Sequence, residues 1–208
     1  AALTDAGYAV DHAFDGEEGH FLGESEPYDA IVLDLGLPKM DGISVLESWR
    51  RTVGAVARES HFLAFQGTPP RRSAITFAKM VASRGLPQFF AVAGGEVVGW
   101  CDVVALSDRE VWSHRGTLGI GVLAAWRGRG LGRALIETTL AAAWAFGFRR
   151  VELKARADNV KAIALYESVG FVREGYHVRA FRLGGVDYDE VSMALLADGA
   201  VPDGVAQP

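Results

Sequence analysis

The sequence is poor in cysteine: Cys101 is the only one among its 208 residues. A single cysteine excludes an internal disulfide and fits a reducing compartment, so we expect a cytoplasmic protein. The longest apolar run, residues 140–148, is interrupted by Gly147 and is far shorter than the roughly 20 residues of a membrane span. No basic and then apolar leader opens the sequence. We therefore expect neither secretion nor membrane insertion.

Basic residues are scarce in the first quarter of the chain. Residues 1–52 hold 11 acidic and 3 basic side chains, whereas the remaining 156 residues hold 15 acidic and 18 basic ones. A net charge of +3 without a Lys/Arg block is too small for a nucleic-acid-binding surface, so we expect no nucleic-acid partner. The change in composition suggests two segments of different origin. A hydrophobic content of 50% excludes a disordered chain.

The acidic segment has the pattern of alternating strands and helices. Residues 8–14 alternate between apolar and small or polar side chains, which predicts a half-buried strand. The apolar run over residues 30–37 carries one carboxylate, Asp34, and predicts a strand buried on both faces. An apolar stripe at spacings of 3 and 4 from Leu46 to Val56 predicts one helix over residues 42–59.

Three motifs in this segment, GYAVD at 7–11, DGEE at 15–18 and YDAIVLDLGLPKMDG at 28–42, resemble the receiver domain of bacterial response regulators. The resemblance places Asp34 at the phospho-accepting aspartate. Beyond Trp49 it ends, and the acidic pair that holds Mg²⁺ would precede residue 1. We therefore expect residues 1–52 to be a truncated receiver-like segment. Asp34 is either a structural carboxylate or the phosphorylation site of a signalling module.

The rest of the chain predicts an α+β fold. We expect helices and strands in this order: a helix over 71–84, a hairpin of 89–92 and 97–106, a strand over 117–123, a helix ending near 146, a strand over 151–156, a helix over 159–169, and a hairpin of 171–183 and 188–196. One βα crossover among antiparallel pairs predicts a single mixed sheet flanked by helices. Residues 197–208 are expected to be a flexible tail.

The motif RGRGLG at 127–132 joins an expected strand to an expected helix. Glycines allow the backbone to approach an anion, and the helix contributes the positive end of its dipole. Arg127 and Arg129 would add charge-assisted donors. The motif therefore predicts a diphosphate site, and the alternative is a tight turn with two solvated arginines.

This motif has the form Arg-x-x-Gly-x-Gly. Together with LGIGV at 118–122, Asn159, Tyr166 and the pair Gly170-Phe171, it resembles the GNAT superfamily of N-acetyltransferases over residues 53–196. The resemblance implies acetyl-CoA as the donor, with its pyrophosphate on the amides of 128–132, its pantetheine beside 120–122, and Asn159 reaching a backbone or pantetheine amide. The cofactor-binding residues so implied are Ile120, Gly121, Val122, Arg127, Gly128, Arg129, Gly130, Leu131, Gly132 and Asn159.

The resemblance also implies direct attack of an amine on the thioester in a ternary complex. Tyr166 would be the general acid that protonates the leaving thiolate, although its helical stripe also suits a core position. For the general base, the candidates are Asp102, Glu110 and His114. We favour Asp102, because burial in an apolar strand would raise the pKa of its carboxyl. No metal site is expected.

The acceptor is expected to be a primary amine of a small molecule or a peptide. The loops at 60–72, 107–116 and 173–188 would choose among acceptors. The last hairpin is a candidate edge for a homodimer. Two alternatives to an enzyme of this kind remain, a signalling module regulated by phosphorylation of Asp34 and a protein that binds acyl-CoA without turnover.

Overall fold

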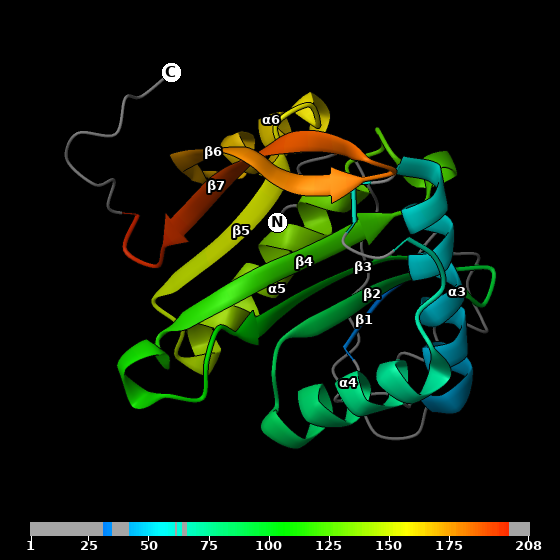
Figure 1. The fold of residues 1–208 in the computed structure, drawn as a ribbon. Helices are drawn as coiled ribbons and strands as arrows, with labels where there is room; N and C mark the ends of the chain where they lie inside the picture. Colours follow the sequence, from blue (N-terminus) through cyan, green and yellow to red (C-terminus); the bar gives the residue numbers. More distant parts are fainter. Residues whose placement is uncertain (1–30, 35–41, 61, 64–65, 200–208) are drawn as a thin grey trace.

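The computed structural model describes residues 31–34, 42–60, 62–63 and 66–199 (Figure 1). Its strands form one seven-stranded sheet in the order β1-β2-β3-β4-β5-β7-β6. Neighbouring strands are antiparallel except β4 and β5, which are parallel. The predicted mixed, mostly antiparallel sheet is therefore confirmed. The strand expected over residues 8–14 lies outside the described residues.

The receiver-like segment contributes two elements to this sheet. Strand β1 (Ile31–Asp34) pairs antiparallel with β2 (Gln88–Ala93). Helix α3 (Gly42–Ser60) is a single helix that runs through the composition boundary at residue 52. Gly54 lies on the side of α3 that meets the following loop, where a methyl group would lie 2.0 Å from Thr68 Oγ1. A glycine is therefore needed where the loop crosses the helix. The strand expected within residues 30–37 and the helix expected over 42–59 are both present.

The other elements lie close to their expected positions. They are α4 (Arg71–Arg84), β3 (Glu96–Ala105), the 3₁₀ turn η1 (Glu110–Trp112), β4 (Arg115–Val122), the 3₁₀ turn η2 (Ala124–Trp126), α5 (Leu131–Phe146), β5 (Arg150–Arg156), α6 (Val160–Val169), β6 (Val172–Leu183) and β7 (Val186–Leu196). None of the described helices is long and apolar enough to cross a membrane.

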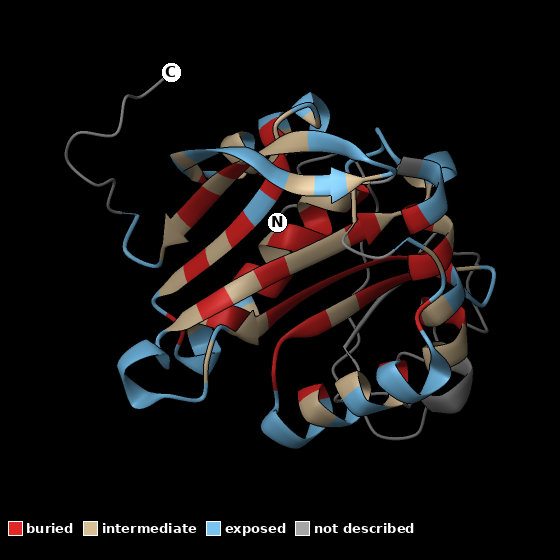
Figure 2. Ribbon diagram, viewed as in Figure 1, coloured by how far each residue is buried: buried red, intermediate tan, exposed pale blue. Residues whose placement is uncertain are grey.

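Side chains of β3 alternate between two hydrophobic clusters, one on each face of the sheet. Trp100 packs in a cluster with Trp49 and Val53 of α3. Cys101 and Val103 pack in a larger cluster with residues of α5. Figure 2 shows the central strands β2 to β5 as mostly buried or half-buried, whereas β6 at the edge of the sheet is mostly exposed. Successive side chains of a strand point to opposite faces, and an irregularity beside Val98, where the register with β2 shifts, lets Val98 and Cys101 share one cluster.

The sheet opens between its two parallel strands. β4 and β5 pair at Arg115 with Arg150, at Gly116 with Val151 and at Thr117 with Glu152. Beyond these pairs the strands diverge toward their carboxyl ends, as Figure 1 shows. The edge of β4 over residues 118–122 is therefore not paired with β5, and its backbone groups on that side are available to a ligand.

Candidate active site

The glycine-rich corner forms a site for an anion at the start of α5. Gly128 and Gly130 have φ angles of +74° and +81°, which side chains of L residues rarely adopt. Gly130 is the N-cap of α5 and supplies no side-chain cap, and the first helical bond is donated by Ala134 N to its carbonyl. The N–H groups of residues 131–133 consequently lack intrahelical acceptors, which is the arrangement that binds phosphate.

The arginines of the corner contact neighbouring groups of the protein. Arg127 Nε donates to the carbonyl of Val122 at 2.7 Å, and its Nη2 pairs with Glu59 of α3 at 3.0 Å. The guanidinium of Arg129 lies 5.3 Å from the ring centre of Trp126. Arg127 thus ties the end of β4 to the last turn of α3. The fit of the corner to a diphosphate therefore depends chiefly on backbone N–H groups.

The remaining expected cofactor residues surround the opening between β4 and β5. Ile120, Gly121 and Val122 form the unpaired end of β4. Asn159 follows β5 directly and caps α6, where its Oδ1 accepts from Ala162 N at 3.4 Å. Gly132 packs α5 closely against α6, since a methyl group there would lie 3.2 Å from Leu165 Cδ2. The structure therefore gathers these residues around one opening.

Tyr166 lies on α6 with its ring against the edge of Phe171, at 6.0 Å between ring centres. It is half-buried and packs against the larger cluster. Burial raises the pKa of its hydroxyl well above the ordinary value, and the nearby Cys101 adds to the rise. A hydroxyl with such a pKa is protonated at neutral pH and can act as a proton donor.

Asp102 lies in the middle of β3 with its carboxylate over β4. Its Cα partners are Gln88 on β2 and Gly119 on β4. A methyl group at residue 119 would lie 3.1 Å from Asp102 Oδ1, so the glycine leaves room for the carboxylate. Asp102 is 7% exposed. Burial raises its pKa to about 7, and Gln88 opposes that rise, which gives a base suited to neutral pH.

Asp102 and Tyr166 lie on opposite faces of the sheet. Asp102 alternates along β3 with Cys101, and Cys101 packs in the same cluster as Tyr166. A base and an acid on opposite faces can serve one substrate only where the sheet is open between them. That opening is the one between β4 and β5.

The two other candidate bases lie elsewhere. Glu110 belongs to η1, and His114 precedes β4, where its carbonyl accepts from Arg149 N at 2.9 Å. Both are at the amino-terminal end of β4, where it is paired with β5. Neither of them lies beside the opening, because the part of β4 that is not paired with β5 is at the other end of the strand. Within the described ranges no group of His, Cys, Asp and Glu residues could hold a metal ion.

Sequence reasoning missed an aromatic site around Arg156, the last residue of β5. Its guanidinium is 7% exposed and lies 3.6 Å from the ring centre of Tyr188, 4.8 Å from that of Phe62 and 5.8 Å from that of Phe181. It also pairs with Asp158. Two of the three loops expected to choose the acceptor meet here. No local pattern reveals the site, because its rings come from distant segments.

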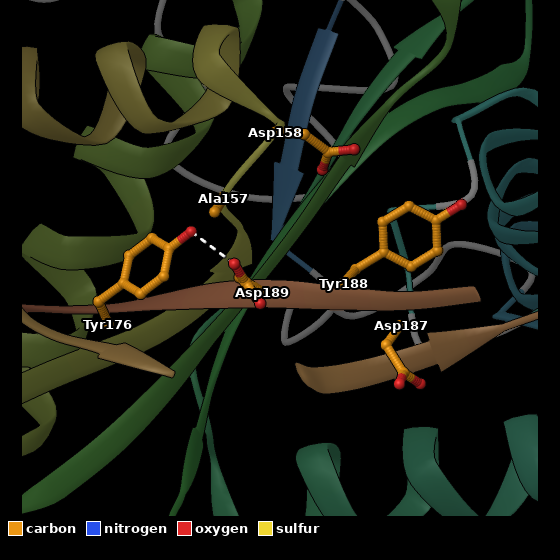
Figure 3. Close-up of a pocket in the computed structure, with 6 residues that line it drawn as sticks. All are labelled: Ala157, Asp158, Tyr176, Asp187, Tyr188 and Asp189. Carbon is orange, nitrogen blue, oxygen red and sulfur yellow. Dashed lines mark hydrogen bonds between the residues drawn. The ribbon is translucent and has the colours of Figure 1, made fainter. Parts of the chain in front are cut away.

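An open pocket of about 400 Å³ adjoins Arg156 (Figure 3). In it, the hydroxyl of Tyr176 donates to Asp189 at 2.7 Å. Its lining holds three carboxylates and two tyrosine rings, contributed by Ala157, Asp158, Tyr176, Asp187, Tyr188 and Asp189. The lining carboxylates already have partners within the protein, because Asp158 pairs with Arg156 and Asp187 with Arg182 at 3.5 Å.

The comparisons with known proteins agree with this geometry. The model of the acetyltransferase (GNAT) family matches residues 55–171, which is more than half of the chain. The chain belongs to the GNAT family. Members of this family take the acetyl group from acetyl-CoA, so the predicted enzyme class and cofactor are confirmed.

One relative of this GNAT chain is the N-alpha-acetyltransferase RimI of Mycobacterium tuberculosis, which is 34% identical over 146 residues, 65% of this chain and 87% of that protein. Two solved structures share its fold at 19% identity each. A ribosomal-protein-alanine N-acetyltransferase from Brucella melitensis has a TM-score of 0.71 and covers 80% of this chain and 99% of its own. A phosphinothricin acetyltransferase from Sinorhizobium meliloti, solved with acetyl-CoA, has a TM-score of 0.72 and covers 86% and 96%.

The amino-terminal part has a different relative. The transcriptional regulatory protein QseB of Haemophilus influenzae is 56% identical over 48 residues, which are 23% of this chain and 22% of that protein. The receiver-like resemblance is therefore confirmed at the level of sequence. Because the match spans about a fifth of the regulator, it carries no conclusion about the regulator's activity.

Proposed function

We propose that this GNAT protein transfers an acetyl group from acetyl-CoA to a primary amine by direct attack in a ternary complex. The observation that carries the proposal is the opening between β4 and β5 beside the uncapped start of α5. The N–H groups of residues 131–133 would hold the pyrophosphate, and the free edge of β4 over 120–122 would hold the pantetheine. Acetyl-CoA supplies the activated acetyl thioester.

Asp102 and Tyr166 would act on the two sides of the thioester. Asp102 takes a proton from the acceptor ammonium, which is mostly protonated at neutral pH. The amine nitrogen forms its bond to the acetyl carbon, and the bond from that carbon to sulfur breaks. The hydroxyl of Tyr166 gives its proton to the departing sulfur, and the second proton that the nitrogen loses on forming the amide returns Tyr166 to its neutral form. Unpaired N–H groups on β4 would stabilise the negative charge that develops on oxygen.

The acceptor amine would enter on the face that carries Asp102. The RimI relative is named as an N-alpha-acetyltransferase, an enzyme of α-amino groups. We therefore propose peptides with a free α-amine as the first class to test, ahead of small-molecule amines.

Release of coenzyme A thiol from acetyl-CoA tests the proposal, with peptides bearing free or blocked α-amines and with polyamines as acceptors. We expect release that depends on a free amine. Its kcat/KM should rise with pH through about 7, because Asp102 must lose its proton to act. In Asp102→Asn, kcat/KM should fall about 100-fold and this inflection should disappear. Tight binding of acetyl-CoA without release for any amine would instead indicate a non-catalytic acyl-CoA-binding protein.

A further inference from the structure

Gln88 is a buried polar side chain to which the proposed mechanism gives no role. It is the first residue of β2 and is 2% exposed. Its Nε2 makes no hydrogen bond within normal limits of distance and angle, although the amide lies close enough to the Asp102 carboxyl to lower its pKa. A buried amide without a partner costs free energy, whereas an apolar side chain of the same size would not. Glutamine at this place therefore suggests a role other than packing.

The register of three strands aligns Gln88 with the proposed base. Gln88 is opposite Asp102 on β3, and Asp102 is opposite Gly119 on β4. Cross-strand partners project from the same face of a sheet. The Asp102 carboxylate consequently has Gln88 on one side and the space over Gly119 on the other. Gly119 itself lies in the part of β4 that is not paired with β5.

We propose that Gln88 is a positioning residue for Asp102, and that its carboxamide holds the carboxylate over Gly119 at the edge of the opening between β4 and β5. The inference rests on the function proposed above for Asp102. Closing of the amide onto the carboxylate would satisfy the free Nε2 donors and restrict the carboxylate to one orientation.

The other groups around Asp102 leave Gln88 as its polar neighbour. Helix α3 covers this face with the apolar side chains of Trp49 and Val53. Arg115 of β4 and Glu152 of β5 lie on the same face toward the amino-terminal end of β4, and they pair with each other at 2.8 Å. On the other face, the pKa of Cys101 is raised by its own burial and by the charge of Asp102. The pKa of Asp102 itself responds to burial, which raises it, and to Gln88, which lowers it.

A neutral donor is the suitable partner for a base that must work near neutral pH. A cationic partner would lower the pKa of Asp102 far below 7 and would weaken it as a base. An apolar partner would leave burial unopposed and keep the carboxyl protonated at neutral pH. The N–H groups of Gln88 oppose burial without adding a charge.

Titration of Asp102 by NMR tests the inference without depending on activity. The protein is labelled with ¹³C at the side-chain carboxyl of aspartate, and the signal of Asp102 is assigned with Asp102→Asn. In Gln88→Met, which keeps the length but removes the donors, the midpoint should rise by about one pH unit. The acid limb of kcat/KM should move by the same amount, with kcat at pH 8.5 changed much less. In Gln88→Asn, a second variant that keeps the amide, the shift should be smaller.

Thr52→Val is the matched control. Thr52 is buried on the same face and donates to the carbonyl of Val97 at 2.5 Å, away from Asp102. Its replacement should reduce stability and leave the Asp102 midpoint in place. An unchanged or lower midpoint in Gln88→Met would overturn the inference. If the midpoint moves but Asp102→Asn retains full activity, the role of Asp102 in the proposed function fails while the contact with Gln88 stands.

Discussion

On the face of the sheet covered by α5, the buried side chains are almost entirely apolar, with Thr139 as a polar exception. The face covered by α3 has a smaller apolar cluster and also buries polar groups, namely Ser48, Thr52, Gln88 and Asp102. Buried polar groups cost stability unless they are satisfied. Ser48 and Thr52 are hydrogen bonded to β3 or its side chains, whereas the donors of Gln88 are not.

This difference indicates that the two faces of the sheet have different roles in the proposed mechanism. The apolar face holds α5, whose start binds the cofactor through backbone groups in the proposed mechanism. Such a site needs a rigid scaffold and few special side chains. The polar face holds the proposed base, whose chemistry needs a buried carboxylate with a raised pKa. We therefore expect the buried polar groups on the face covered by α3 to lower the free energy of unfolding and to make it depend on pH.

Removal of residues 1–40 should have the largest effect, because it should disrupt the hydrophobic clusters on both faces of the sheet. The deletion removes β1 and exposes the edge of β2, on which both clusters are built. We expect insoluble protein, measured as the soluble fraction after expression beside the full chain. A truncated protein that unfolds cooperatively and is fully active would show that the receiver-like strand is dispensable.

Tyr166→Phe tests the apolar face. Loss of the hydroxyl should lower kcat by about 100-fold or more, because the thiolate must then leave without a proton donor. Steady-state thiol release measures the effect. Thr76→Ala removes an exposed hydroxyl on α4 that donates to the carbonyl of Arg72, away from the proposed site, and serves as the control. Its kcat should change less than about twofold. Equal losses in the two variants would mean that Tyr166 has no special role.

Asp102→Asn tests how far the buried Asp102 carboxyl lowers the stability of the protein as the pH rises. A carboxyl whose pKa is raised in the fold stabilises the protein fully below pH 4, and this stabilisation is lost as the pH rises through about 7. The wild type should thus lose at most about 4 kcal/mol of unfolding free energy over this range. The Asp102→Asn variant should not lose this free energy over the same pH range. Thermal melts at pH 5 and pH 8 should show its advantage growing with pH. An advantage that is independent of pH would contradict the raised pKa.

Gly121→Ala should have the smallest effect on stability among these changes. A methyl group at residue 121 would lie 2.2 Å from the ring of Trp100, so the indole has to move. We expect a loss of about 1–3 kcal/mol in denaturant unfolding. Gly67→Ala is the control, because no atom lies within 4 Å of its new methyl group. A neutral Gly121→Ala would show that the smaller cluster is loosely packed.

Much of the fold follows from local patterns. The apolar stripe of α3 and the glycine-rich corner before α5 each lie within one continuous stretch, so spacing alone predicts them. The order of helices and strands follows in the same way. The prediction of a diphosphate site at the corner likewise depends only on local sequence, namely glycines followed by the start of a helix.

The rest of the site depends on contacts between distant segments. The position of Asp102 over Gly119 is set by the register of β3 and β4, and a shift of one residue would have turned the carboxylate to the other face. The rings around Arg156 come from segments more than 100 residues apart. Arg127 was expected to hold phosphate, and its bond to Val122 depends on how the corner folds back on β4.

Helix α3 crosses the boundary between the two segments that differ in composition, so it fixes their relative rotation about the helix axis. Its first half carries receiver-like sequence, and its last turn places Glu59 on Arg127 at the cofactor corner. One residue inserted near Thr52 would rotate everything after it by about 100°. Val53 would turn out of the core and Glu59 would turn away from Arg127. A genetic join between two such segments could therefore survive only at lengths that keep this helical phase.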